Sequence, residues 1–164
     1  MSIDLEERER ERQRLRAVYL VESPERSASV ARGVHHIALL CADVERTIRF
    51  YQEVLGFPLA EIFENRDYPG STHLFFDIGH GNFLAFFDFP GLGLGPYAEV
   101  LGGLHHIAIS VDPEAWESAR ARLEDAGVEC QVDSDVSLYF SDPDGARLEL
   151  IAERLSSLYG TPLH

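Results

Sequence analysis

One short segment occurs twice in this chain. "GVHHIALL" spans residues 33–40, and "GLHHIAIS" spans residues 103–110. The neighbours of each histidine pair are apolar and strand-forming, and histidine is a poor core residue unless its ring nitrogens find partners. One such histidine is ordinary. Two histidine pairs in matching contexts indicate an internal repeat in which both pairs have the same role.

The residues after each segment repeat as well. In the first half, Asp43 is a plausible N-cap for a helix over 44–55, and Gly56 follows that helix where a C′ glycine belongs. In the second half, a helix over 113–126 begins with Pro113 in its first turn and is followed by Gly127. Three strand-like runs follow each helix, at 57–65, 71–79 and 82–89, and at 128–133, 136–142 and 146–152. Each half therefore predicts the order β-α-β-β-β.

This repeat sets the expected domain boundaries. We predict a first module over 33–90 and a second over 103–153, joined by a glycine- and proline-rich linker over 91–102. Residues 1–32 form a charged N-terminal arm and linker, in which 4–17 alternate acid and base and favour a solvated helix or a frayed arm. Residues 154–164 remain as a C-terminal tail.

Charge and composition exclude several classes of partner. The formal charge of −14 argues against nucleic acid and anionic membrane surfaces. No apolar run approaches the length of a membrane span, and the N-terminus is too charged for a signal peptide, so we expect a cytoplasmic protein. Cys41 and Cys130 lie in apolar, strand-like contexts, which favours buried free thiols over a disulfide.

The repeated histidines suggest a metal site. Alternate residues of a strand face opposite ways, so one histidine of each pair would point into the concave side of its sheet. If the two modules pack as halves, one histidine from each can converge. Glu149 lies between leucines on an apolar strand, where an ionised carboxylate is costly to bury alone. Two imidazoles and one carboxylate make a facial ligand set that leaves positions open for water, substrate or oxygen.

The chain resembles the vicinal oxygen chelate superfamily, the glyoxalase, bleomycin resistance protein and extradiol dioxygenase family. The resemblance rests on "GVHHIALLCADVERTIRFYQEVLGF", on "GLHHIAISV" and on "LYFSDPDGARLELI", and it covers residues 33–153. It implies an α+β fold in which two tandem βαβββ modules form a cupped, mostly antiparallel sheet. Carried over by motif, it implies His36, His106 and Glu149 as metal ligands. Aligning Gly81 with Gly145 puts Ala85 against Glu149, at the fourth family position, where glyoxalase I has a carboxylate.

Other residues become candidates through their place beside these ligands. His73 could be a general acid or base near the metal, and Tyr139 matches a tyrosine that contacts ligand in fosfomycin-resistance enzymes. His35 and His105 are expected to face away from the site, in structural or supporting roles. The expected substrate pocket consists of Phe75, Phe83, Ala85, Phe87 and Arg147.

Two functions follow from the resemblance. The first is an enzyme that uses one divalent ion, Fe, Mn, Zn, Ni or Co, to chelate neighbouring oxygens of a small-molecule substrate, with dioxygenase-like or lyase/transferase-like chemistry. The alternative is a metal-free module that sequesters a small molecule or drug, as bleomycin-resistance proteins do. Family members are commonly dimers, so we expect a homodimer. Whether the two modules of one chain close on each other or swap with a partner chain stays open.

Overall fold

The computed structural model describes residues 4–21, 25–158 and 161–162. Two compact units divide the chain. One holds residues 33–155, and the other holds the described parts of residues 1–32 and 156–164. None of the helices in the described residues is long and apolar enough to cross a membrane.

The smaller unit contains helix α1 (Leu5–Tyr19) and a two-stranded antiparallel pair, β9 (Ser157–Leu158) and β10 (Thr161–Pro162). The Asp4 side chain caps α1 by accepting the backbone N–H groups of Glu6 and Glu7, each at 3.0 Å. No residue of α1 is buried. The expectation of a solvated helix is confirmed, and its stability rests on capping and on ion pairs one turn apart.

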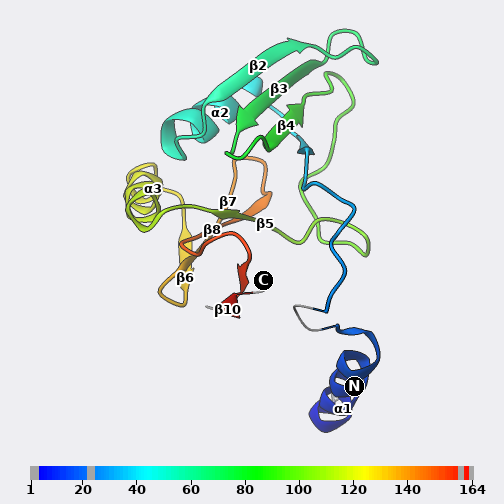
Figure 1. Cartoon of the computed structure of the whole chain (residues 1–164). Coiled ribbons are helices and arrows are strands. Elements are labelled where there is room, and N and C mark those ends of the chain that lie inside the picture. The colour runs from blue at the N-terminus through cyan, green and yellow to red at the C-terminus, as the bar shows by residue number, and fades with distance from the viewer. Residues whose placement is uncertain (1–3, 22–24, 159–160, 163–164) are drawn as a thin grey trace. The chain divides into compact units, whose positions relative to one another are not determined.

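The first module folds in the predicted order. It contains β1 (His36–Leu40), α2 (Val44–Ile48), β2 (Leu59–Glu64), β3 (Thr72–Asp77) and β4 (Phe83–Phe87). The sheet order is β1-β4-β3-β2, with β1 parallel to β4 and the other pairs antiparallel (Figure 1). Asp43 caps α2 as predicted, and Gly56 has a positive φ of 81° past the helix end.

The first helix differs from the prediction in its second half. From Arg49 to Val54 the chain forms a π-helix, η1, instead of continuing as an α-helix. Here the N–H of Leu55 donates to the carbonyl of Phe50, five residues earlier. The wider turn still buries Phe50, Tyr51 and Leu55. Apolar spacing alone could not separate these two helix types, because both present that face to the core.

The second module repeats the first. It contains β5 (Ile107–Ser110), α3 (Pro113–Asp125), β6 (Cys130–Asp133), β7 (Ser137–Ser141) and β8 (Arg147–Ile151). The sheet order is β5-β8-β7-β6, again with one parallel pair, β5 with β8 (Figure 1). The α+β class and the tandem βαβββ order are confirmed, and each module makes a four-stranded sheet of its own.

Buried contacts join the two modules. The Tyr51 hydroxyl donates to Asp142 Oδ2 at 3.0 Å, and both residues are buried. The Phe50 and Phe140 rings lie 6.3 Å apart. Arg122 on α3 donates to the carbonyl oxygens of Val54 at 2.5 Å and Leu55 at 3.3 Å. One hydrophobic core therefore extends through both modules.

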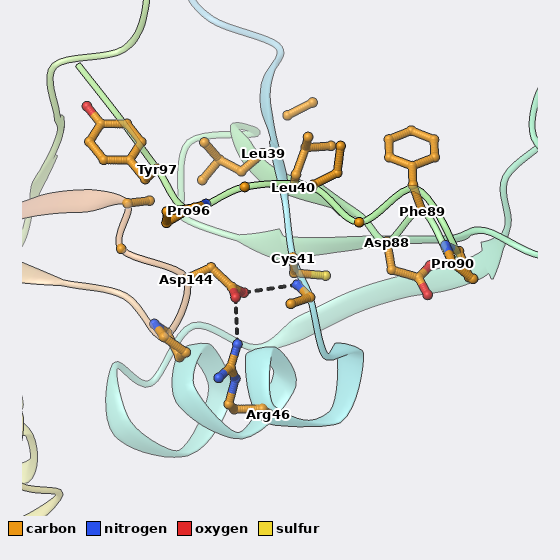
Figure 2. Close-up of a pocket in the computed structure, with 18 of the residues that line it drawn as sticks. Leu39, Leu40, Cys41, Arg46, Asp88, Phe89, Pro90, Pro96, Tyr97 and Asp144 are labelled. Carbon is orange, nitrogen blue, oxygen red and sulfur yellow. Dashed lines mark hydrogen bonds and ion pairs between the residues drawn. The ribbon is translucent and has the colours of Figure 1, made fainter. Parts of the chain in front are cut away.

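The "DPDG" turn, residues 142–145, is part of this joint. Asp142 also accepts the backbone N–H groups of Asp144 and Ala146. Asp144 accepts the backbone N–H of Ala42 at 3.2 Å and pairs with Arg46 at 2.5 Å (Figure 2). Both carboxylates of the turn thus bond the first module to the second.

The two cysteines are free, as expected, but only one of them is buried. Cys41 is buried, and burial raises the pKa of its thiol to about 11. Cys130 is half-buried because it starts β6, which is the outer strand of its sheet.

Candidate metal centre

Strand register defines which side chains share a face. In the second module, Ala108, Glu149, Tyr139 and Gln131 lie directly opposite one another across β5, β8, β7 and β6. In the first module, the matching row is Ala38, Ala85, Phe75 and Glu61 across β1, β4, β3 and β2. The register therefore puts Ala85 in the place of Glu149, as the sequence alignment predicted.

Two of the three expected ligands meet in the second module. His106 Nε2 lies 3.2 Å from Glu149 Oε2. Glu149 is only 5% exposed, so its carboxylate depends on local partners rather than on water. The Tyr139 ring lies 5.7 Å from the His106 ring, edge to face. Partial burial, followed by a hydrogen bond to Glu149, raises the pKa of the Tyr139 hydroxyl.

The paired histidines form hydrogen-bonded units. The Nδ1 atoms of His35 and His36 are 2.9 Å apart, and those of His105 and His106 are 2.6 Å apart. His35 and His105 therefore each contact the candidate ligand beside them. Each of them precedes the first residue of its strand, His36 or Ile107, so strand alternation does not apply to it.

A further acid extends the second pair. His105 Nε2 lies 3.6 Å from Glu99 Oε1, and both side chains are mostly exposed. Sequence reasoning missed Glu99, because it lies in the linker and no motif connects it with the histidines. The result is a line of side chains from Glu99 through His105 and His106 to Glu149.

His36 belongs to a different cluster. It is exposed, and its ring lies 5.9 Å from that of Phe75. Within residues 4–21, 25–158 and 161–162, no three His, Cys, Asp or Glu side chains are grouped to hold one metal ion. His36 therefore does not join His106 and Glu149 within the described chain.

His73 lies among aromatic rings on the same face as Phe75. Its ring stacks on Phe87 at a centroid distance of 3.8 Å and lies 4.2 Å from Phe75 and 5.2 Å from Phe63. Its Nε2 atom is buried and has no hydrogen-bond partner. Burial, and then the charge of His36, lower the pKa of His73. The unpartnered nitrogen could take part in proton transfer only with a molecule that reaches it between the surrounding rings.

The expected pocket residues of the first module form an aromatic face. Phe75, Phe83 and Phe87 are half-buried, whereas Ala85 has no exposed surface. Ala85 therefore lies beneath the rings rather than at the surface. Phe63 on β2 extends the same face, and its place beside His73 in the register was not foreseen. In the sequence, only the apolar residues near Phe63 indicated that it could belong to this face.

Arg147 lies on the matching face of the second module. Its guanidinium carbon is 4.8 Å from the centre of the Tyr139 ring. A hollow of about 580 Å³ opens there. Gln131 and Ser141 also line this hollow and were not predicted.

A separate cavity of about 990 Å³ lies along β1, the segment 88–97 and the "DPDG" turn (Figure 2). Its polar side chains are those of Arg46, Asp88, Tyr97 and Asp144. No histidine lines it, so the candidate metal centre lies elsewhere.

Comparisons with known proteins agree with this architecture. The Bacillus subtilis (strain 168) protein named "Putative ring-cleaving dioxygenase MhqA" is 31% identical over 140 residues, which cover 80% of this chain and 43% of that protein. The chain thus spans less than half the length of this relative. The Escherichia coli (strain K12) protein named "Uncharacterized protein YaeR" is 36% identical over 127 residues, covering 71% of this chain and 93% of that protein.

Solved structures give the same result. The crystal structure of a "glyoxylase/bleomycin resistance protein/dioxygenase domain" from Frankia sp. EAN1pec has a TM-score of 0.65 and 24% identity. It covers 78% of this chain and 100% of that one, and it supports the fold alone. The sequence model of the family described as "Glyoxalase/Bleomycin resistance protein/Dioxygenase superfamily" matches residues 33–150. With the fold, the register and this match in agreement, the chain belongs to the glyoxalase/bleomycin resistance protein/dioxygenase superfamily.

Proposed function

We propose that the chain is one subunit of a homodimeric enzyme that uses a divalent metal ion to bind two neighbouring oxygens of a small molecule. The buried carboxylate of Glu149, 3.2 Å from His106, carries this proposal. A buried carboxylate and an imidazole on one face are two parts of a 2-His-1-carboxylate set. His36, the matching histidine of the first module, is the third.

A second copy of the chain would supply His36. His36 stands apart from the His106–Glu149 pair in the described chain. His36 begins β1, and His106 directly precedes β5. Within the described residues both of these strands end their four-stranded orders and so have one unpaired edge, whereas Glu149 lies on the neighbouring strand β8. Open edges favour pairing with another chain. A two-fold dimer that placed the first module of one copy against the second module of the other would complete two equal sites.

The ligand chemistry fits a divalent ion. Two neutral imidazoles and a carboxylate suit Fe, Mn, Zn, Ni or Co, and they leave positions for substrate. When bound, such an ion would polarise both substrate oxygens and, as iron, would also activate dioxygen.

The paired histidines have a role in this scheme. A histidine that binds metal through Nε2 carries its proton on Nδ1. His36 and His106 would then donate that proton to Nδ1 of His35 and His105. His105 in turn would hold its own proton on Nε2, facing Glu99. Each first histidine would therefore fix the tautomer and ring orientation of the second.

Ring cleavage by dioxygen is the reaction that the geometry favours. Ala85 leaves the first module without the second carboxylate that the glyoxalase I pattern uses. The aromatic face of Phe75, Phe83 and Phe87 suits a flat ring. The similarity to MhqA supports the same reaction class.

Two side chains would handle the substrate protons. His73 would accept a proton from a ring hydroxyl if substrate binding opened access to its Nε2 atom, which is buried and unpartnered. The Tyr139 hydroxyl, beside Glu149, can hold a hydrogen bond to a substrate oxygen.

Metal content and subunit mixing test the proposal together. We expect one equivalent of metal per chain in the purified protein, lost in both His36→Ala and Glu149→Ala. Mixing these two inactive variants after subunit exchange should restore about a quarter of wild-type sites, because half of the dimers are mixed and each mixed dimer has one intact site.

Other outcomes would overturn parts of the scheme. No restoration, despite confirmed mixed dimers, would put the site within one chain. No metal after reconstitution with each ion would favour the metal-free sequestration function. Zinc or nickel with no oxygen consumption would favour lyase or transferase chemistry.

A further inference from the structure

Among the residues that the structure describes, Arg147 has no polar partner. Among the described residues of 33–155, three arginines are half-buried, namely Arg120, Arg122 and Arg147. Arg120 pairs with Glu124, and Arg122 donates to backbone carbonyls. In the part of the chain that the structure describes, Arg147 makes no ion pair or hydrogen bond. A partly exposed guanidinium without a protein acceptor keeps its five N–H donors available to water or to a ligand.

Its surroundings orient the guanidinium. Arg147 lies 4.8 Å from the centre of the Tyr139 ring. A guanidinium that lies over an aromatic ring contacts the ring with its flat face. Its N–H groups, which point outward along its edge, stay available to a planar acceptor. Tyr139 lies directly opposite Glu149 in the strand register. Arg147 is thus held beside the candidate metal ligands without pairing with them.

The hollow beside Arg147 is polar and has room for a ligand group. It has a volume of about 580 Å³, and its lining includes Gln131, Ser141 and Tyr139. Register places Ser141 directly opposite Arg147, and Gln131 opposite Tyr139. The amide and hydroxyl are neutral donors that can complete the coordination of an anion.

The local charges select a monoanion. One guanidinium faces the hollow, while Glu129 lines the same hollow with negative charge. A dianionic phosphate usually takes more than one cation, whereas a carboxylate matches a single guanidinium in a bidentate pair. A carboxylate is therefore the better match.

We propose that this hollow is a subsite for a carboxylate of the substrate, held by Arg147, so that the enzyme acts on an aromatic acid rather than on the corresponding neutral ring. This inference rests on the proposed function. The substrate would carry two neighbouring oxygens for the metal and a carboxylate for Arg147.

Paired probes separate charge from shape. The zinc-loaded protein is titrated with 2,3- and 3,4-dihydroxybenzoate, each compared with its own neutral amide. Zinc has no redox chemistry, so the probes are bound without being consumed. We expect at least one acid to bind about tenfold more tightly than its amide, which is the scale of a hydrogen-bonded charge pair.

Three variants assign the preference to one side chain. Arg147→Gln should reduce the acid-to-amide ratio to about one while it leaves the zinc content unchanged. Arg147→Lys should retain part of the preference, because it keeps the charge and loses the bidentate fork. Arg120→Gln is the matched control: Arg120 also lies over a ring, that of Trp116 at 5.9 Å, but on helix α3. It should leave the ratio unchanged.

The outcomes separate this inference from the proposed function. Equal affinity for acid and amide, no binding of any probe, or an acid preference that survives Arg147→Gln would overturn the carboxylate subsite, even in a protein that binds metal. A protein that takes up no zinc is titrated as it is. An acid preference that depends on Arg147 would then uphold the subsite while the metal enzyme fails.

Discussion

The two modules share a backbone plan but not a surface. Both have the same strand order and the same parallel pair, and both begin with a hydrogen-bonded histidine pair. At matched positions, however, the first module has aromatic or small apolar residues where the second has polar ones. The matched pairs are Ala85 and Glu149, Phe83 and Arg147, and Phe75 and Tyr139.

This difference shows what each half contributes. The core faces of both sheets are apolar, because they pack against helices. The opposite faces carry different residues on the same strand order, so these residues do not determine the fold. In the first module that face suits a flat apolar ring, and in the second it suits oxygen and charge.

Removing the acid of the second module is expected to have the largest effect. Glu149→Ala makes this face resemble the first module and removes the one carboxylate of the proposed ligand set. We expect metal affinity to fall by at least about 100-fold. Titration with a chelator-buffered metal series measures this. Glu129→Gln, an exposed acid next to β6, is the control, and equal losses in both variants would contradict the comparison.

Substitutions in the two histidine pairs test whether the first histidine of each pair supports the proposed metal ligand beside it. His35→Ala and His105→Ala each remove a hydrogen-bond partner of the proposed ligand. Metal affinity should fall by about 10- to 100-fold in each, while the metal stoichiometry at saturation stays unchanged. Chelator competition measures both quantities. An unchanged affinity in both variants would mean that the first histidine of each pair does not support the ligand.

The joint between the modules should matter for stability. Asp142→Ala leaves the buried Tyr51 hydroxyl and two backbone N–H groups without their acceptor. We expect the free energy of unfolding to fall by at least about 2 kcal/mol. Asp142→Asn keeps one acceptor oxygen for the backbone groups, so it should cost less. Urea denaturation of both variants checks this order, and an equal loss in both would refute it.

The same residue predicts a pH dependence. Burial, opposed by its hydrogen bonds, raises the pKa of Asp142. Between its ordinary and its raised pKa, the folded state binds more protons at this site than the unfolded state. The contribution of Asp142 to stability is therefore lost as pH rises through the folded pKa. Asparagine does not titrate, so the stability of Asp142→Asn relative to wild type should improve from about pH 4 to pH 7. Urea midpoints across that range would refute this if the difference stayed constant.

The surface pair of the joint should matter least. Arg46 pairs with Asp144, but its side chain is 48% exposed. Arg46→Ala should lower the free energy of unfolding by less than about 1 kcal/mol. The loss should shrink further in high salt. A cost as large as that of Asp142→Ala would mean that the exposed half of the "DPDG" turn, rather than the buried half, holds the modules together.

Sequence patterns predicted most of this architecture because the repeat carried the information twice. Apolar spacing, Asp43 and Gly56 located the first helix, and strand alternation located the sheet faces. The alignment of Ala85 with Glu149 also agrees with the register. These features depend on residues close in sequence, which is where propensity and periodicity are informative.

The rest depended on contacts between distant residues. The hydrogen bond from Tyr51 to Asp142 joins residues 91 positions apart, and the sequence around neither residue indicates this contact. The orientation of His35 and His105 depended on where each strand begins, which is the least certain part of any prediction. The separation of His36 from Glu149 depended on how two sheets pack, which a pattern within each sheet does not specify.

The open edges of β1 and β5 have a consequence for behaviour at low concentration. If two chains must associate to complete a site, dilution would separate them. Each separated subunit would lose its complete metal-ligand set and would also expose two unpaired strand edges. Specific activity would then fall with dilution. The chains so released would be the species most prone to aggregate.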